Sequence, residues 1–171
     1  MSSYIKLIIF IVVLLAVSIA IVSMDSSMEN INKSMTNISD SIVQGDEDYN
    51  ESVKLLNERS FYEANQKAQS ARDNFNESLE KLLKIRYKYE DDLNNVHEDY
   101  FDALINELEI KLKAVDELNQ SIYYLENYYN YTGSTHGTEA NDLMANAVQF
   151  QNERNSIVKE NPKLFEKQKG F

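Results

Sequence analysis

The chain has no cysteine, one proline and only four glycines in 171 residues. The absence of cysteine excludes disulfides, thiolate metal sites and cysteine nucleophiles. The scarcity of glycine and proline disfavours β-sandwich and α/β folds, because tight turns depend on these residues. A few long helices need the fewest turns. The sequence therefore predicts an all-α fold.

Positive charge is also scarce, since 17 Lys and Arg stand against 28 Asp and Glu and give a net charge of −11. Lys6 is the only charged side chain before Asp25, so the acidic excess belongs to residues 25–171. A surface of this kind repels phosphate backbones, which argues against nucleic acid as a partner. It attracts cationic partners, although an ordinary solvated surface explains the same composition.

One long apolar run is present at residues 7–24, and it contains no charged residue. With its flanks it reaches the roughly 20 residues that cross a bilayer as a helix. Lys6 precedes the run and Asp25 follows it, so the positive-inside rule places residues 1–6 in the cytoplasm and residues 25–171 outside. The sequence thus predicts a single-pass protein of the cell membrane with a signal-anchor helix.

A cleavable secretory signal is the alternative for this run, with Ser18 and Ala20 as the small residues of the cleavage site. The run is longer than the core of about 7–15 apolar residues that is usual in such signals, and neither proline nor glycine interrupts it. Its length favours the uncleaved anchor. A mature protein that begins near Ile21 would refute this interpretation.

Beyond the anchor, apolar residues recur every three or four positions, which is the period of an α-helix. A thin stripe at residues 25–45 predicts a helical stalk that ends at Gly45. Residues 46–161 predict an extracytoplasmic helical domain, and residues 162–171 a flexible tail. The expected fold is an antiparallel bundle or hairpin stack of three to four long helices.

Two interruptions divide this domain. At residues 91–95, paired Asp and Asn favour a turn, and Asn95 with Glu98 has the spacing of a capping box. Without this turn, one continuous helix over residues 60–130 would need a coiled-coil partner. Residues 131–138 contain two glycines and are predicted to be a loop before the last helix, whose stripe includes Arg154 and extends to Ile157.

Residues 49–72 combine two short helical stretches, and the second carries Ala64, Ala68 and Ala71 on one face. This segment resembles one hairpin of a tetratricopeptide repeat, a family that packs small residues at these points. The aromatic and Leu-Gly positions of the family's first helix are not matched, and no second copy follows at the period of about 34 residues. The resemblance implies helix-hairpin packing and protein binding.

The two histidines are the candidates for acid–base or metal chemistry. His97 lies among carboxylates, but Asn94 occupies the position where the Glu-x-x-His pattern of di-iron bundles needs glutamate. A solvated helix start is therefore the better prediction for His97. His136 has no nucleophile motif around it. The sequence predicts no catalytic, cofactor-binding or metal-binding residue, and no cofactor.

Five tyrosines crowd into residues 123–131, and they cannot all face one core because neighbouring helical positions point in different directions. Tyr129 fits the packed stripe of its helix, whereas Tyr124, Tyr128 and Tyr131 are expected to share an exposed face. Exposed tyrosines are favoured at recognition surfaces, so these three are the candidate partner-binding residues. The alternative is that their rings cover the next helix.

The predicted function is a non-enzymatic, membrane-anchored protein-interaction or scaffold module whose partner is another protein or a second copy. The alternative is an extracytoplasmic bundle that senses or binds a small-molecule ligand together with a partner subunit. A thermal-shift screen of sugars, amino acids and metals separates the two, since only the second predicts a responder. An enzyme is the weakest hypothesis, because the sequence shows no convergent polar groups.

Overall fold

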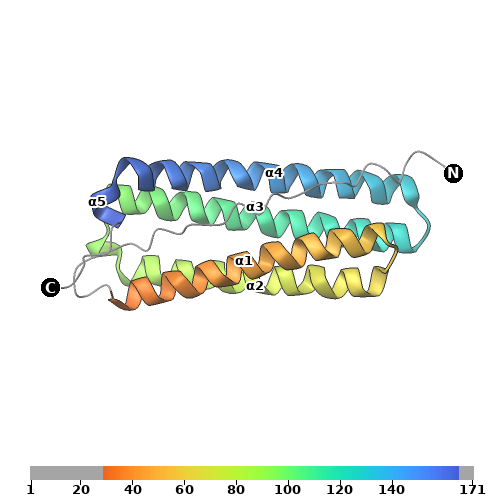
Figure 1. Cartoon of the computed structure of the whole chain (residues 1–171), viewed down its shortest axis with the longest axis horizontal. Coiled ribbons are helices and arrows are strands. Elements are labelled where there is room, and N and C mark those ends of the chain that lie inside the picture. Colours follow the sequence, from red (N-terminus) through yellow and green to blue (C-terminus); the bar gives the residue numbers. More distant parts are fainter. Residues whose placement is uncertain (1–28, 166–171) are drawn as a thin grey trace.

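The computed structural model describes residues 29–165, which form an antiparallel four-helix bundle (Figure 1). The predicted all-α bundle is confirmed, and the described residues contain no strand. The elements are α1 (Glu29–Asn57), α2 (Phe61–Lys88), a 3-10 turn (Glu90–Asp92), α3 (Asn95–Glu126), α4 (Asn130–Glu160) and the short α5 (Pro162–Phe165).

The bundle consists of two hairpins. Helix α1 packs along α2, and α3 packs along α4, while α2 and α3 join the two hairpins. The α1–α2 and α3–α4 turns lie at one end of the molecule, which we call the tyrosine end (Figure 1). The α2–α3 connection, α5 and the beginning of α1 lie at the opposite end, which we call the α5 end.

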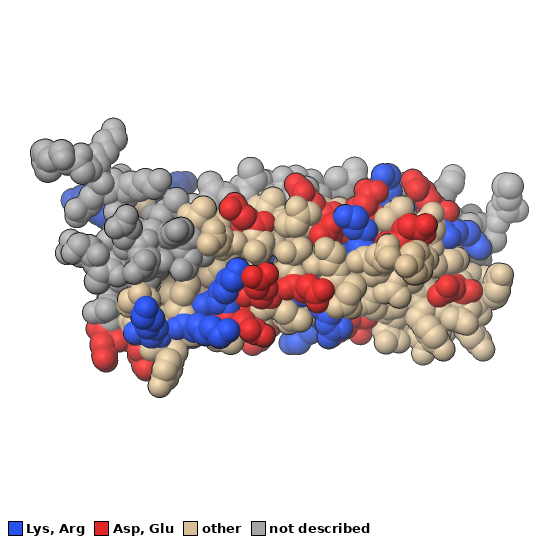
Figure 2. All heavy atoms as spheres, turned by 90° about the horizontal axis from the view of Figure 1, so that it is seen from below, with Lys and Arg blue, Asp and Glu red and all other residues tan. Residues whose placement is uncertain are grey.

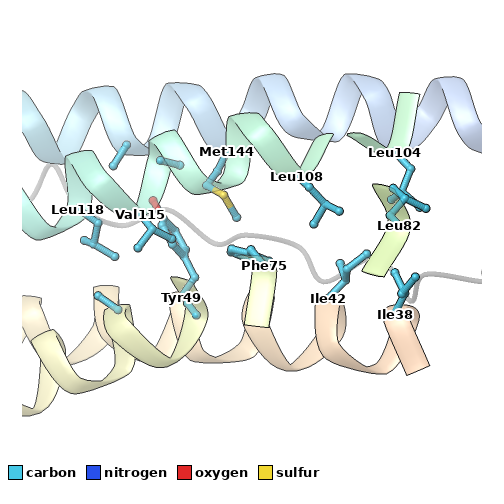
Figure 3. Packing of buried hydrophobic residues seen from close by; sticks show 14 of the residues in the cluster. Ile38, Ile42, Tyr49, Phe75, Leu82, Leu104, Leu108, Val115, Leu118 and Met144 are labelled. Atoms are coloured by element: carbon cyan, nitrogen blue, oxygen red, sulfur yellow. The ribbon is translucent and has the colours of Figure 1, made fainter. Parts of the chain in front are cut away.

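The core lies between the hairpins and follows the apolar stripe of each helix, as an amphipathic helix in a bundle requires. Figure 3 shows side chains from both hairpins meeting in this layer. The first hairpin contributes Ile38, Ile42, Tyr49, Phe75 and Leu82, and the second contributes Leu104, Leu108, Val115, Leu118 and Met144.

The two hairpins follow one plan. The Ser52 hydroxyl donates a hydrogen bond to the Ala64 carbonyl at 2.7 Å, and the Ser121 hydroxyl donates to the Gly133 carbonyl at 2.7 Å. Ser52 and Ser121 differ in residue number by a fixed offset, and the same offset relates every buried residue of α2 to a buried residue of α4. The pairs are Ala64 and Gly133, Ala68 and Gly137, Ala71 and Ala140, Phe75 and Met144, Ser78 and Ala147, Leu82 and Gln151, and Ile85 and Arg154. The chain therefore contains an internal structural repeat.

Helix α1 passes through Gly45 without a break, so the predicted end of a stalk at this residue is wrong. Ile42 is fully buried before it, and the division between residues 25–45 and 46–161 falls inside a packed helix. Gly45 is needed for close packing, because a Cβ there would lie 2.5 Å from Cε1 of Phe75. The glycine makes room for an aromatic ring and does not end a helix.

Residues 131–138 belong to the first turns of α4, so the predicted loop is wrong. The chain reverses direction just before them, at residues 127–129. Gly133 and Gly137 are buried against α3, and a Cβ at Gly133 would lie 2.6 Å from Cγ of Leu125. Gly133 therefore allows α3 and α4 to approach each other closely.

Two helix ends differ from their predicted positions. The break at residues 91–95 is confirmed, which excludes one continuous helix, but the N-cap of α3 is Asn94 and not Asn95. The Asn94 side chain accepts the backbone N–H three residues later at 3.0 Å. The predicted flexible tail, residues 162–171, begins with α5, whose Phe165 is buried.

The predicted membrane anchor at residues 7–24 lies outside the described residues. Of the helices between residues 29 and 165, none combines the length and the apolar character that crossing a membrane requires. The membrane location and the orientation inferred from the sequence therefore stay predictions.

Candidate functional site

The tyrosine end carries four strongly exposed tyrosines around the α3–α4 turn, and Tyr62 beside the α1–α2 turn is 70% exposed. Tyr131 and Tyr128 are 86% and 82% exposed, and Tyr129 and Tyr123 are 62% and 58% exposed. The prediction of an exposed surface at Tyr128 and Tyr131 is confirmed, although they lie on the α3–α4 turn and on α4 and not on one helix face. Tyr129, expected in the core, is exposed because the helix has already ended before it.

Tyr124 is partly buried at the centre of an aromatic cluster. Its ring packs edge-to-face on Tyr123 and Tyr129, with centroids 5.4 and 6.2 Å apart. It also stacks on the His136 ring at 5.2 Å and an interplanar angle of 5°. Tyr124 therefore supports the exposed tyrosines around it rather than presenting a free face.

His136 lies beside an acid that the sequence did not reveal. His136 lies on α4, and its Nδ1 atom is 2.6 Å from Oε2 of Glu117 on α3. A carboxylate that orients a histidine is part of many catalytic sites, but a nucleophile must also be within hydrogen-bond reach. Among residues 29–165, the Glu117 carboxylate is the only hydrogen-bond partner of the His136 ring. The contact joins α3 to α4 beneath the tyrosines.

Both turns at the tyrosine end hold a residue in the left-handed backbone region. Arg59 has φ 62° in the first turn and Tyr128 has φ 65° in the second. Ser60 N–H donates to the Leu55 carbonyl at 2.9 Å, and the equivalent bond runs from Tyr129 N–H to the Tyr124 carbonyl at 2.8 Å. This Schellman closure normally places glycine at the left-handed position, since other residues lose about 1 kcal/mol there.

The strained residues gain little from packing. The side chains of Arg59 and Tyr128 are exposed, so burial does not compensate the backbone cost. Strain without a packing reason is typical of residues retained for function. On the face drawn in Figure 2, charges of both signs interleave along the bundle, and uncharged side chains cover the lower part of the tyrosine end.

A second candidate site lies inside the bundle and consists of buried charges. Lys111 Nζ donates to both oxygens of Asp46 at 2.7 Å. Arg154 donates to Oε2 of Glu107 through Nε at 3.0 Å and through a terminal nitrogen at 2.7 Å, and it donates to the Tyr100 hydroxyl at 3.3 Å. Lys111 Nζ also lies 3.1 Å from Oε1 of Glu107, an ion pair without hydrogen-bond geometry. We call these groups the charged layer.

The charged layer is balanced in charge but not fully satisfied in hydrogen bonds. Burial raises the pKa of the Asp46 carboxyl, and the nearby Lys111 only partly opposes this effect. Burial alone would lower the pKa of Arg154, but Glu107 and Tyr100 together outweigh this effect, and the pKa is raised. The Tyr49 hydroxyl has no hydrogen-bond partner among the described residues, and burial raises its pKa.

The charged residues of this layer occupy positions that are apolar in the other hairpin. Glu107 and Lys111 correspond to Ile38 and Ile42, and Arg154 corresponds to Ile85. Asp46, the contribution of the first hairpin, corresponds to Val115. An apolar set of residues thus fills the same frame, and the fold does not demand charge at these points. The sequence alone could not identify this layer, because its partners lie on different helices.

His97 is buried at the α5 end, so the prediction of a solvated helix start is wrong. Its ring packs edge-to-face on Phe165 with centroids 5.8 Å apart, and neither ring nitrogen has a hydrogen-bond partner among the described residues. Burial lowers the pKa of His97. Phe165 also contacts the Tyr100 ring at 5.5 Å, so α5 covers both side chains.

Within residues 29–165, no group of three or more His, Asp or Glu side chains is placed to hold a metal ion. Compared with known proteins, the chain matches no family model, no curated protein and no solved structure. The tetratricopeptide resemblance of residues 49–72 therefore rests on the sequence alone, although the helix hairpin that it implied is present.

Proposed function

We propose that the chain is a non-enzymatic, membrane-tethered interaction module that presents its tyrosine end to a protein partner outside the cell. The observation that carries the proposal is Tyr128. Its side chain is 82% exposed, and its backbone is held at a φ of 65° where glycine would be less strained. Exposed tyrosines at the centre of a surface are typical anchors of protein interfaces.

The direction of the bundle supports the same proposal. Only residues 25–28 separate the predicted anchor at residues 7–24 from α1, which begins at the α5 end. An anchored chain would therefore keep the α5 end near the membrane. Helix α1 has 29 residues, so the tyrosine end would stand about 40 Å further out. That is the position from which a partner is most easily reached.

The test is photo-cross-linking of the full chain in its native membrane, with a photoreactive amino acid at Tyr129, which is 62% exposed and is not changed in any of the compared variants. The double variant Tyr128→Gly and Tyr131→Ser is expected to lose the cross-linked partner while keeping its helical content, because neither side chain packs in the core. The matched control is Tyr87→Ser, which removes a tyrosine that is 84% exposed near the other end of α2. It should retain the partner.

Three results would contradict the proposal. The first is no partner from the otherwise unchanged chain with the reagent at Tyr129, and the second is equal loss of the partner in the double variant and the Tyr87→Ser control. The third is release of the bundle from membranes by salt, which would refute the anchor. A ligand-sensing bundle would instead give a thermal shift with a small molecule.

A further inference from the structure

Because the two hairpins are alike, each hairpin must distinguish the other one from a second copy of itself. The two hairpins share the same frame and the same small residues at the helix contact, such as Ala64 and Gly133. Each also offers an apolar face to the other (Figure 3). Apolar faces of matching shape do not by themselves distinguish a first hairpin from a second. Two first hairpins, from two copies of the chain, could pair with similar burial.

The charged layer breaks this symmetry. Lys111 of the second hairpin meets Asp46 of the first, at 2.7 Å and with both side chains almost fully buried. If two second hairpins paired, each Lys111 would meet the equivalent of Asp46, which is Val115. If two first hairpins paired, each Asp46 would meet the equivalent of Lys111, which is Ile42. Both like pairings bury an unbalanced charge, because Asp46 would lose Lys111 and the Glu107–Lys111–Arg154 group would keep a net positive charge, and this is strongly unfavourable.

We propose that Asp46 and the Glu107–Lys111–Arg154 group form a recognition site through which a second hairpin accepts a first hairpin and rejects another second hairpin. Glu107 and Arg154 lie on α3 and α4, so their pair stays within the second hairpin and positions Lys111. Lys111 is the group that contacts the other hairpin and distinguishes a first hairpin from a second one. The inference does not depend on the tyrosine end or on the membrane anchor.

The experiment replaces the layer with the residues that the other hairpin has at the same places. The fourfold variant Asp46→Val, Glu107→Ile, Lys111→Ile and Arg154→Ile is expected to stay helical and to form like pairs between chains. Because the chain has no cysteine, Glu58→Cys gives a single exposed labelling point on the first hairpin. Donor-labelled and acceptor-labelled full chains are unfolded together, refolded in detergent and examined for energy transfer.

The fourfold variant should show energy transfer between first hairpins. The chain that carries only Glu58→Cys should show no more transfer than a control in which donor-labelled and acceptor-labelled chains are mixed after folding. Equal transfer in the two would overturn the proposal. An unfolded fourfold variant would also overturn it, since the layer would then be required for the fold itself. The matched control removes Asp48 and Lys67, an ion pair of 2.6 Å within the first hairpin, by Asp48→Asn and Lys67→Gln, and should show no transfer.

A charge exchange tests recognition directly. Chains with Asp46→Lys alone or Lys111→Asp alone carry like charges at the contact and should each be destabilised. Refolded together, they can exchange hairpins, so that the two substituted positions face each other with opposite charges and the native pair forms at the second contact. Energy transfer from Glu58→Cys on one chain to Asn127→Cys on the other should appear only in the mixture. A mixture that behaves as the sum of its components would overturn the proposal.

Discussion

The first hairpin buries Ile38, Ile42 and Ile85 at the positions where the second buries Glu107, Lys111 and Arg154. Turns, helix lengths and small residues at the helix contacts are otherwise alike in the two halves. The comparison separates the features that the shared backbone of the two hairpins requires from the side chains that it tolerates. The frame needs close helix contact beside each turn, and it tolerates either apolar or charged side chains further along, provided that the charges are paired.

The halves also differ in what they gain from their cores. An apolar core is stabilised by the area removed from water, whereas a buried ion pair regains most of its desolvation cost and little more. A balanced layer is therefore weak evidence for stability but strong evidence for selectivity, since any unpaired member is costly. Single substitutions in the charged layer should be severe, and matched double substitutions should be mild.

The largest effect is expected for Arg154→Ile. The change leaves the Glu107 carboxylate fully buried with only Lys111 beside it, and a loss of about 3–5 kcal/mol in unfolding free energy is expected. Glu107→Ile combined with Arg154→Ile gives the second hairpin the residue types of the first and should recover most of this loss. Urea denaturation followed by circular dichroism measures both. A double variant no better than the single one would refute the comparison.

A smaller effect is expected for Gly45→Ala, because the new methyl group would lie 2.5 Å from the Phe75 ring. Overpacking of this kind costs about 1–3 kcal/mol of unfolding free energy. The second hairpin has alanine and methionine at the equivalent positions, Ala114 and Met144. Adding Phe75→Met to Gly45→Ala should therefore restore part of the stability. The double-mutant cycle is measured by thermal denaturation, and strict additivity would contradict the proposed contact.

Prediction from the sequence succeeded where the signal was local and periodic. The three-to-four spacing of apolar residues gave the helical class, and the paired Asp and Asn at residues 91–95 gave the α2–α3 break. The stripe of the last helix included Arg154, which is buried. Its partner Glu107 could not be recognised, because a glutamate on a long helix has the same local pattern whether it faces water or a guanidinium.

The glycines show why other predictions failed. Gly45 and Gly133 were interpreted by their local preference for helix ends and loops, but both lie inside helices at points of close contact with Phe75 and Leu125. The requirement for glycine at these points comes from a side chain on a neighbouring helix, so the sequence around each glycine does not reveal it. The repeat was missed for a related reason, since its equivalent residues share size or burial more often than identity, as Ile85 and Arg154 illustrate.

The smallest effect concerns His97, which has no equivalent within the described part of the first hairpin. Burial holds the pKa of His97 below its ordinary value of 6.5, so the unfolded chain binds the proton more readily than the folded one. The stability that His97 contributes is therefore present above pH 6.5 and is lost as the pH falls from there to the lowered folded pKa. Asp46 acts in the opposite sense at lower pH, because its raised pKa favours protonation in the folded state.

His97→Gln should flatten the loss of stability just below pH 6.5 without changing the behaviour of Asp46, and urea denaturation at a series of pH values measures this. The ring of Phe165 covers His97, so protonation should first loosen α5 and only then the bundle. Hydrogen exchange at Leu164 and Phe165 should accordingly rise at acid pH in wild type before exchange rises at Leu108. Simultaneous rises would mean that α5 and the core open as one unit, and would remove the distinction between the α5 end and the charged layer.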